Sequence, residues 1–131
     1  MKACWDTSAL VKATSDLKLR ERVQKERPFT RAHSLAEAFS ALTGGNLGIR
    51  VDANDAAATL EDLSRDLEFI DLNALEVLTA FKTARAKGVR GGRVHDYLHA
   101  VAAEKQKATE ILTADVNDFN ELTEVKIVQL T

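Results

Sequence analysis

Short apolar runs alternate with longer stretches of helical periodicity along the chain. The apolar runs, which predict strands, cover residues 2–6, 29–30, 67–70, 111–113 and 125–130. Strands that alternate with helices of about ten residues are typical of a parallel sheet covered by helices on both faces. We therefore predict a single α/β domain that comprises residues 1–131, without internal repeats or linkers.

Capping patterns predict where several helices begin and end. Ser34 with Glu37, and Asn73 with Glu76, have the three-residue spacing of a capping box. The glycine-rich segment 44–46 is expected to end the helix that follows Ser34. The helix after the first strand follows two residues that can cap it, Thr7 and Ser8.

The composition is that of an ordinary globular domain, with 45% hydrophobic and 29% charged residues. No apolar run approaches the roughly 20 residues needed to cross a bilayer, so we expect no membrane segment. Lys2 and Asp6 place charges too early for a signal peptide. The single cysteine, Cys4, cannot form an internal disulfide and fits a reducing compartment. We therefore expect a cytoplasmic protein.

The net charge of −2 conceals a basic segment between residues 77 and 95, which contains no acid. Grouped cations allow a mildly acidic protein to bind a polyanion. Cations near the end of a helix also complement the helix dipole, so both interpretations stay open for Lys82 and Arg85. The cations of this basic segment are Lys82, Arg85, Lys87, Arg90 and Arg93.

Four acids follow predicted strands or open predicted helices. Asp6 and Asp115 come after apolar strands, whereas Glu37 and Asp96 lie in the first turns of helices. In a parallel sheet these positions meet at the carboxyl edge of the strands, where ligands bind in open α/β folds. Taken alone, each acid is better explained as a cap or a turn residue, and Asp118 could also be a cap. A shared pocket is the more economical explanation for all four.

Such a pocket requires a cation. Two carboxylates about 4 Å apart repel by roughly 4 kcal/mol at an effective dielectric constant near 20, so four need raised pKa values or bound metal. Carboxylates alone favour the hard ions Mg²⁺ and Mn²⁺. These ions activate water for phosphodiester hydrolysis without a side-chain nucleophile. The residues expected to orient the acids or waters are Thr7, Ser8, Thr113 and Asn117.

Other constellations are weaker. His95 and His99 have the i, i+4 spacing of paired metal ligands but no convincing third ligand. His95 followed by Asp96 also resembles metal-dependent HD phosphohydrolases, whose all-helical fold conflicts with the apolar strands. Cys4 lies in an apolar strand, which favours a core residue over a nucleophile.

Four segments together resemble the PIN domain family, most closely the VapC-like toxins of bacterial toxin–antitoxin pairs. In chain order they are MKACWDTSALVKA, SLAEAFSAL, GGRVHDYLHAVAAE and ILTADVNDF. The resemblance extends from residue 1 nearly to the C-terminus, and the order and spacing of the motifs are specific in combination. It implies a three-layer α/β/α domain with a central five-stranded parallel sheet, acting as a metal-dependent endoribonuclease.

The resemblance also implies roles for single residues. The family's acids, which hold Mg²⁺ or Mn²⁺ and carry catalysis, fall on Asp6, Glu37, Asp96 and Asp115. The accompanying hydroxyls fall on Thr7 or Ser8 and on Thr113, and Asp118 is an auxiliary acid. The chain departs from the family at Arg31 and His33, where small or polar residues are expected. These two either line an RNA groove or are surface residues.

VapC-like proteins usually form homodimers and are inhibited by a cognate antitoxin that offers a cation to the acids. The resemblance therefore implies an antitoxin partner, an RNA substrate and a homodimer. We expect an apolar groove around residues 17–23 and 35–42 to receive the antitoxin, whose Arg would bind the acids through charge-assisted bonds. Two alternatives stay open: a PIN-fold module that binds nucleic acid or protein without cutting, and a housekeeping nuclease of RNA maturation.

Overall fold

Five parallel strands form one sheet in the order β3-β2-β1-β4-β5. This computed structural model describes residues 2–45, 48 and 50–131, so Asn46 of the predicted helix-ending segment lies outside the described residues. The strands are β1 (Cys4–Trp5), β2 (Phe29–Arg31), β3 (Glu68–Ile70), β4 (Glu110–Thr113) and β5 (Lys126–Gln129). The predicted five-stranded parallel sheet is confirmed.

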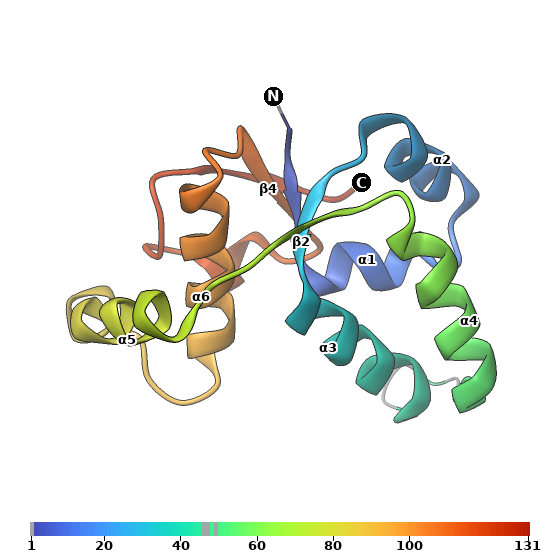
Figure 1. Cartoon of the computed structure of the whole chain (residues 1–131), viewed down its shortest axis with the longest axis horizontal. Helices are drawn as coiled ribbons and strands as arrows, with labels where there is room; N and C mark the ends of the chain where they lie inside the picture. The colour runs from blue at the N-terminus through green and yellow to red at the C-terminus, as the bar shows by residue number, and fades with distance from the viewer. Residues whose placement is uncertain (1, 46–47, 49) are drawn as a thin grey trace.

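Helices cover both faces of the sheet, which gives the predicted α/β/α layers (Figure 1). The chain passes from β1 outward through β2 to β3, and then crosses back to β4 and β5. Because right-handed crossovers in opposite directions place their helices on opposite faces, the sheet is covered on both sides. The helices are α1 (Thr7–Ala13), α2 (Leu17–Glu26), α3 (Ala32–Thr43), α4 (Ala53–Ser64), α5 (Ala74–Thr83) and α6 (Arg93–Lys105), with short 3-10 helices η1 (Arg85–Lys87) and η2 (Val116–Phe119).

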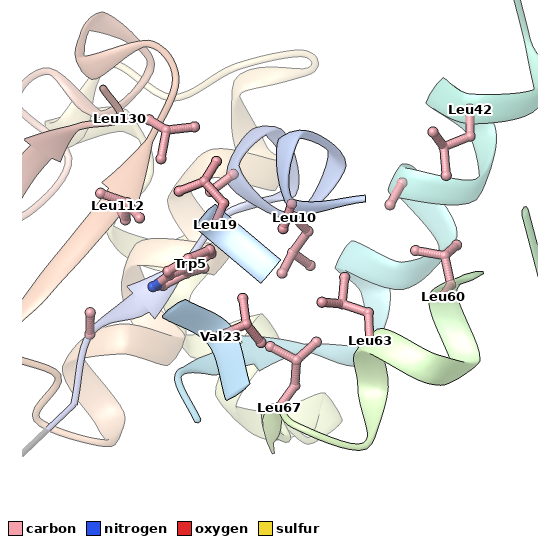
Figure 2. Close-up of a cluster of buried hydrophobic side chains, with 14 of the residues drawn as sticks. Trp5, Leu10, Leu19, Val23, Leu42, Leu60, Leu63, Leu67, Leu112 and Leu130 are labelled. Atoms are coloured by element: carbon pink, nitrogen blue, oxygen red, sulfur yellow. The ribbon is translucent and has the colours of Figure 1, made fainter. Parts of the chain in front are cut away.

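Alternate residues of the strands pack into two separate hydrophobic cores, one on each face of the sheet. Trp5 and Leu112 point into a leucine-rich core formed with α1 to α4 (Figure 2). Their neighbours Cys4 and Ile111 point to the opposite face, into a core formed with α5 and α6. This two-residue period is the one expected of a strand buried on both faces. The sheet is thus fixed from both sides, and its carboxyl edge is a rigid support.

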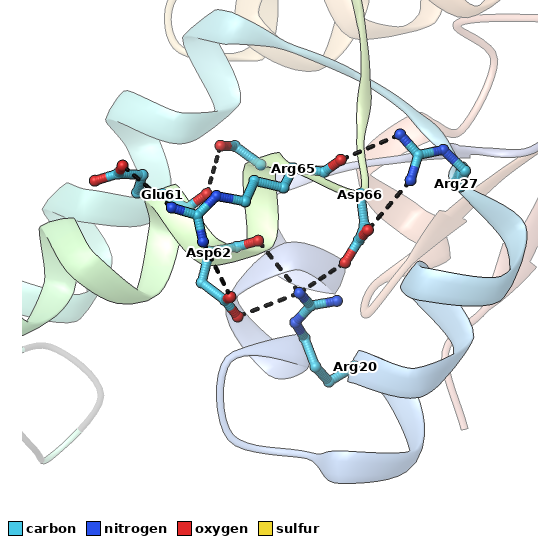
Figure 3. Close-up of polar contacts among 7 residues, drawn as sticks. Arg20, Arg27, Glu61, Asp62, Arg65 and Asp66 are labelled. Atoms are coloured by element: carbon cyan, nitrogen blue, oxygen red, sulfur yellow. Dashed lines mark hydrogen bonds and ion pairs between the residues drawn. The ribbon is translucent and has the colours of Figure 1, made fainter.

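A network of ion pairs connects α2 to the C-terminal end of α4 (Figure 3). The Arg20 Nη2 atom lies 2.8 Å from Asp66 Oδ2 and 3.2 Å from Asp62 Oδ2. Arg27 Nη1 lies 3.2 Å from the other oxygen of Asp66, whose side chain is only 18% exposed. Exposed ion pairs are worth about 0.2–1 kcal/mol each, and shared partners lower the entropy cost of the network.

Two of the predicted helix starts are wrong. Asp6, rather than Thr7 or Ser8, caps α1 with its own carboxylate. Helix α3 begins at Ala32 without a side-chain cap, so Ser34 and Glu37 do not form a capping box. The pairing of β2 with β3 continues to Arg31, and the helix begins directly after it, which leaves Ser34 buried inside the helix. The other predicted capping box, Asn73 with Glu76, is confirmed.

The apolar residues of the groove predicted around residues 17–23 and 35–42 divide into two sets. Leu19, Val23 and Leu42 are buried in the leucine-rich core, while Leu17 is 81% exposed and Phe39 is 37% exposed. Packing within the domain therefore accounts for part of the amphipathic pattern of these helices, and the groove itself stays a prediction. Among the described residues, no helix has the length and apolar character needed to span a membrane.

Candidate active site

Asp6 lies at the carboxyl end of β1, where the chain order of the sheet reverses between β1 and β4. It is 7% exposed, and both carboxylate oxygens accept hydrogen bonds. Oδ1 accepts from the Ser8 hydroxyl at 2.6 Å and from the Ala9 N–H at 3.0 Å. Oδ2 accepts from the Thr113 hydroxyl at 2.6 Å. The reversal point of an open α/β sheet is the usual place for ligands, and here it carries a fixed carboxylate.

The two hydroxyls that hold Asp6 are themselves fixed by backbone. The Ser8 Oγ atom accepts the Ala114 N–H at 2.9 Å, and Thr113 Oγ1 accepts the Asp115 N–H at 3.1 Å. Each hydroxyl therefore donates its single proton to Asp6 and accepts from the segment after β4. These contacts join the ends of β1 and β4 in one hydrogen-bonded unit, in which Ser8 and Thr113 orient the carboxylate.

Glu37 and Asp96 approach the same place from two other elements. Glu37 lies on the second turn of α3, and its Oε1 atom accepts a hydrogen bond of 3.1 Å from the Thr7 hydroxyl. Asp96 lies in the first turn of α6, for which Gly92 occupies the cap position, so Asp96 is not a cap. A cavity of about 290 Å³ is lined by Asp6, Thr7, Ser8, Glu37, Asp96 and Asp118, together with Val11, Ala41, His95 and His99.

The fourth acid lining this cavity is Asp118, rather than Asp115. The exposed Asp115 caps the 3-10 helix η2, and its Oδ1 atom accepts the Asn117 N–H at 2.9 Å. Asp118, one turn further along η2, lines the cavity beside Asp96. Asp6, Glu37 and Asp96 thus line one cavity together with Asp118, the predicted auxiliary acid, whereas Asp115 is not among the lining residues.

The electrostatics of the cavity favour a bound cation. Burial, and then the nearby charges of Asp118, Asp6 and Glu37, raise the pKa of Asp96 to about 7. Burial also raises the pKa of Asp6, against the opposing effect of its three hydrogen bonds. The pKa of Asp118 is raised by burial and by Asp115. A carboxyl group whose charge is unfavourable in the free protein gains most from a positive ligand.

The donor set fits a hard divalent ion. Among the described residues, none donates a hydrogen bond to the carboxylates of Asp96 or Asp118, so their oxygens are free to bind a ligand. Oxygen-only sites suit Mg²⁺ and Mn²⁺, and Mg²⁺ keeps several of its waters when it is bound by one or two carboxylates. The cavity, which is also lined by Thr7 and Ser8, has room for such a hydrated ion.

The other candidate sites, which involve Cys4 and the pair of His95 and His99, do not have the geometry of a catalytic or metal site. His99 is buried, and its Nε2 atom lies 3.3 Å from Cys4 Sγ. Burial lowers the pKa of His99 to about 3 and raises that of Cys4 to about 12, so both are neutral near pH 7. Cys4 is therefore a core residue and not a thiolate nucleophile. His95, in contrast, is exposed, and its possible ligand partners are His33 and Glu37 rather than His99, although both histidines border the acid-lined cavity.

Of the predicted basic segment, Arg93 lies closest to the acids. A second cavity of about 290 Å³ is lined by Arg93, Asp96, Asn117 and Asp118, and it shares two acids with the first. Arg93 also lowers the pKa of Asp96 and Asp118. Arg85 and Arg90 line a separate hollow near η1, while Lys82 is exposed on α5 and Lys87 half-buried in η1. Arg93 is thus the cation of this segment that is placed to meet a substrate at the acids.

Comparison with known proteins agrees with this fold. The family model described as the PIN domain matches residues 3–125, so the chain belongs to the PIN domain family. PIN domains are generally nucleases that use divalent metal ions. The predicted membership of this family is confirmed, and the acid-lined cavity lies in the matched region.

Two solved structures share the fold at low sequence identity. PAE2754 from Pyrobaculum aerophilum matches with a TM-score of 0.71 and 19% identity, over 97% of this chain and 88% of that chain. VapBC-1 from nontypeable Haemophilus influenzae matches with a TM-score of 0.67 and 18% identity, over 98% of both chains. At these identities the likeness shows the shared fold. A comparison with curated proteins finds no match.

Proposed function

We propose that this protein is a divalent-metal-dependent endoribonuclease. The observation that carries the proposal is the convergence of Asp6, Glu37, Asp96 and Asp118 on one cavity at the reversal point of a PIN-domain sheet. Acids gathered in this way are costly for folding unless a cation binds them. Hydrolysis of a phosphodiester with the help of Mg²⁺ or Mn²⁺ requires such a site and no side-chain nucleophile.

Different roles follow from the contacts of each acid. Asp6, locked by Ser8, Thr113 and the Ala9 N–H, would be the fixed ligand that sets the position of the ion. Asp96 and Asp118, which are less constrained, would complete its binding, and Glu37 would hold a water through its free oxygen. The bound ion would supply a Lewis acid for the phosphate and a more acidic water.

The substrate would approach along the side of the cavity that carries Arg93. Its guanidinium donates to the carbonyl oxygen of Asn120, which fixes the side chain beside Asp96 and Asp118. A fixed guanidinium is suited to bidentate contact with a phosphate. Lys82, Arg85, Lys87 and Arg90 would extend the contact along the RNA backbone and make binding sensitive to salt.

Cleavage of structured RNA by purified protein tests the proposal. The reaction would be run with Mg²⁺, with Mn²⁺ and with chelator, beside Asp6→Asn. Asp71→Asn is the matched control, because Asp71 is an exposed acid directly after β3, outside the cavity. We expect metal-dependent cutting that is lost in Asp6→Asn and kept in Asp71→Asn. Folded, metal-loaded protein that cuts no RNA in the panel would favour the non-catalytic binding module.

We further propose that the nuclease is the toxin of a type II toxin–antitoxin pair, acting in the cytoplasm as a homodimer. The sequence resemblance to VapC-like toxins supports this proposal, as does the structural neighbour named VapBC-1. A small upstream open reading frame that encodes a DNA-binding protein would support it. Co-expression of that protein should then abolish cleavage; unchanged cleavage would favour a housekeeping nuclease instead.

A further inference from the structure

Two histidines from distant parts of the chain meet beside Glu37. His33 and Glu37 are one turn apart on α3, and the His33 Nε2 atom lies 3.7 Å from Glu37 Oε1. His95, in the first turn of α6, stacks on His33 with ring centroids 5.1 Å apart and an interplanar angle of 18°. One ligand atom from each of the three residues lies within 4.8 Å of the other two.

The ligand atoms are near one another, but the two stacked imidazole rings have to rotate before both can point at one ion. Around tetrahedral Zn²⁺ with bonds of about 2.0–2.1 Å, neighbouring ligand atoms are roughly 3.3 Å apart. The 3.7 Å separation of His33 and Glu37 nearly meets this value already. The side chains of His33 and Glu37 are 43% and 36% exposed, and His95 is exposed as well, so the three side chains have room to turn toward a common ion.

The chemistry of these ligands differs from that of the neighbouring acids. Two imidazole nitrogens and one carboxylate favour borderline transition metals such as Zn²⁺, whereas oxygen-only ligands favour Mg²⁺ and Mn²⁺. Thr7 donates to Glu37 and thereby orients the carboxylate, as supporting hydrogen bonds do in metal sites. Arg31 is the nearby cation that interacts with Glu37, and a bound ion would have to compete with it.

We propose that His33, Glu37 and His95 form a second metal site for a Zn²⁺-class ion, open to water at its fourth position. Because Glu37 also lines the acidic cavity, the two sites share one ligand. Occupation of the histidine site withdraws Glu37 from the acids. Zn²⁺ therefore inhibits cleavage at fixed Mg²⁺; this regulatory consequence rests on the proposed nuclease function, whereas the binding site itself does not.

Calorimetric titration with Zn²⁺ in excess Mg²⁺ tests the site without any assay of cleavage. The expected result is one equivalent of Zn²⁺ bound to the wild type, with affinity at least tenfold weaker in His33→Gln and in His95→Gln. Asp96→Asn is the matched control, because it removes a neighbouring acid and leaves all three ligands in place. Circular dichroism melts in chelator establish that each variant is folded; His33 and His95 are exposed, which favours this outcome.

Three results would overturn the site. These are a folded wild type that binds no Zn²⁺, folded histidine variants that bind it as tightly as the wild type, and binding lost in Asp96→Asn but kept in the histidine variants. The last result would place the ion in the acidic cavity. Substitution of Co²⁺ gives a further readout, since four-coordinate Co²⁺ has a strong visible absorption that His33→Gln and His95→Gln should abolish. An unchanged spectrum in both variants would also reject the site.

For the regulatory consequence, cleavage is measured at fixed Mg²⁺ with increasing Zn²⁺. Inhibition that is relieved at least tenfold in His33→Gln supports the shared ligand. Equal inhibition of wild type and His33→Gln rejects it, while leaving the calorimetric result to decide the site. A wild type that binds Zn²⁺ but never cleaves RNA refutes the proposed nuclease function and not the metal site.

Discussion

The two walls of the candidate site are built in opposite ways. On one wall Asp6 is 7% exposed and accepts three hydrogen bonds from Ser8, Ala9 and Thr113. On the other, Glu37 is 36% exposed and accepts one hydroxyl bond from Thr7. Folding itself fixes the direction of Asp6, whereas Glu37 can turn toward either the acids or the histidines. The buried wall therefore sets the geometry, and the open wall adapts to the ligand.

The largest expected effect is a difference in cleavage rate between variants of the two acids of η2, Asp118 and Asp115. Removal of one charge that stabilises a phosphoryl transition state costs several kcal/mol, so Asp118→Asn should lower the rate of RNA cleavage by about 10²–10³-fold. Asp115→Asn should change it by less than about threefold, because Asp115 caps η2 and does not line the cavity, and Asn is an equally good cap. Cleavage rates at saturating Mg²⁺ measure both. The reverse order would mean that η2 shifts when metal binds.

A smaller effect is expected from the hydroxyls of the buried wall. Thr113→Val keeps the shape of the side chain but removes the donor to Asp6 Oδ2 and the acceptor of the Asp115 N–H. Loss of such a supporting contact typically costs 10–100-fold in metal affinity or activity. Mg²⁺ titration of the cleavage rate should show a correspondingly higher half-saturating concentration. An unchanged Mg²⁺ dependence in a folded variant would contradict the claim that Asp6 is oriented by this bond.

The pH dependence of stability tests how far the charge of Asp96 destabilises the folded protein when no metal is bound. In chelator, Asp96 has a pKa of about 7 in the folded protein and about 3.8 when unfolded, so the folded state binds more protons between these values. The contribution of Asp96 to stability therefore falls as pH rises from about 4 to 7 and levels off above pH 7. Asp96→Asn should reduce this slope and raise the melting temperature at pH 8 by about 3 °C or more.

Thermal melts at pH 5 and pH 8 in chelator measure this difference, and Asp71→Asn again serves as the control. Equal slopes in wild type and Asp96→Asn would show that Asp96 titrates normally. Addition of Mg²⁺ at pH 8 should stabilise the wild type more than the variant, because a ligand that binds only the folded state raises its stability.

The smallest effect belongs to the open wall. Thr7→Val removes the hydrogen bond to Glu37 Oε1, but the carboxylate remains solvated and can be held by a ligand. We expect a loss of cleavage below about threefold, near the value of one exposed hydrogen bond. The ratio of the loss of cleavage in Thr113→Val to that in Thr7→Val measures how much more Asp6 depends on its supporting hydroxyl than Glu37 does. Equal losses would show that both carboxylates depend alike on their supporting hydroxyls.

Much of the fold was predictable because it rests on local patterns. The five apolar runs and the intervening helical periods fix the strand count and the parallel arrangement, and the motifs around Asp6 and Asp96 indicate the PIN family. Helix starts were less predictable. The sequence around Ser34 and Glu37 satisfies a capping box, yet pairing of β2 with β3 up to Arg31 sets where α3 begins. A tertiary contact overrode a local preference there.

The site was predictable in part for the same reason. Asp115 and Asp118 lie three residues apart in one acidic turn, and which of them lines the cavity depends on how η2 packs against α6 and β5. His95 was paired by its spacing with His99, but the side chain stacks instead on His33, which is 62 positions earlier in the chain. Periodicity along one helix carries no information about such a contact.

The double use of Asp6 has a consequence for how such a chain would change over generations. As the cap of α1, Asp6 contributes about 1 kcal/mol of stability, which offsets part of the cost of burying its charge, so selection for folding gives this residue some support. Asp96 has no such compensating hydrogen bond within the described part of the chain, and its charge opposes folding when no cation is present. A lineage that stopped using this site would therefore be expected to replace Asp96 long before Asp6. The acid that destabilises the protein, and not the best-ordered one, is the better sign that natural selection still maintains an activity here.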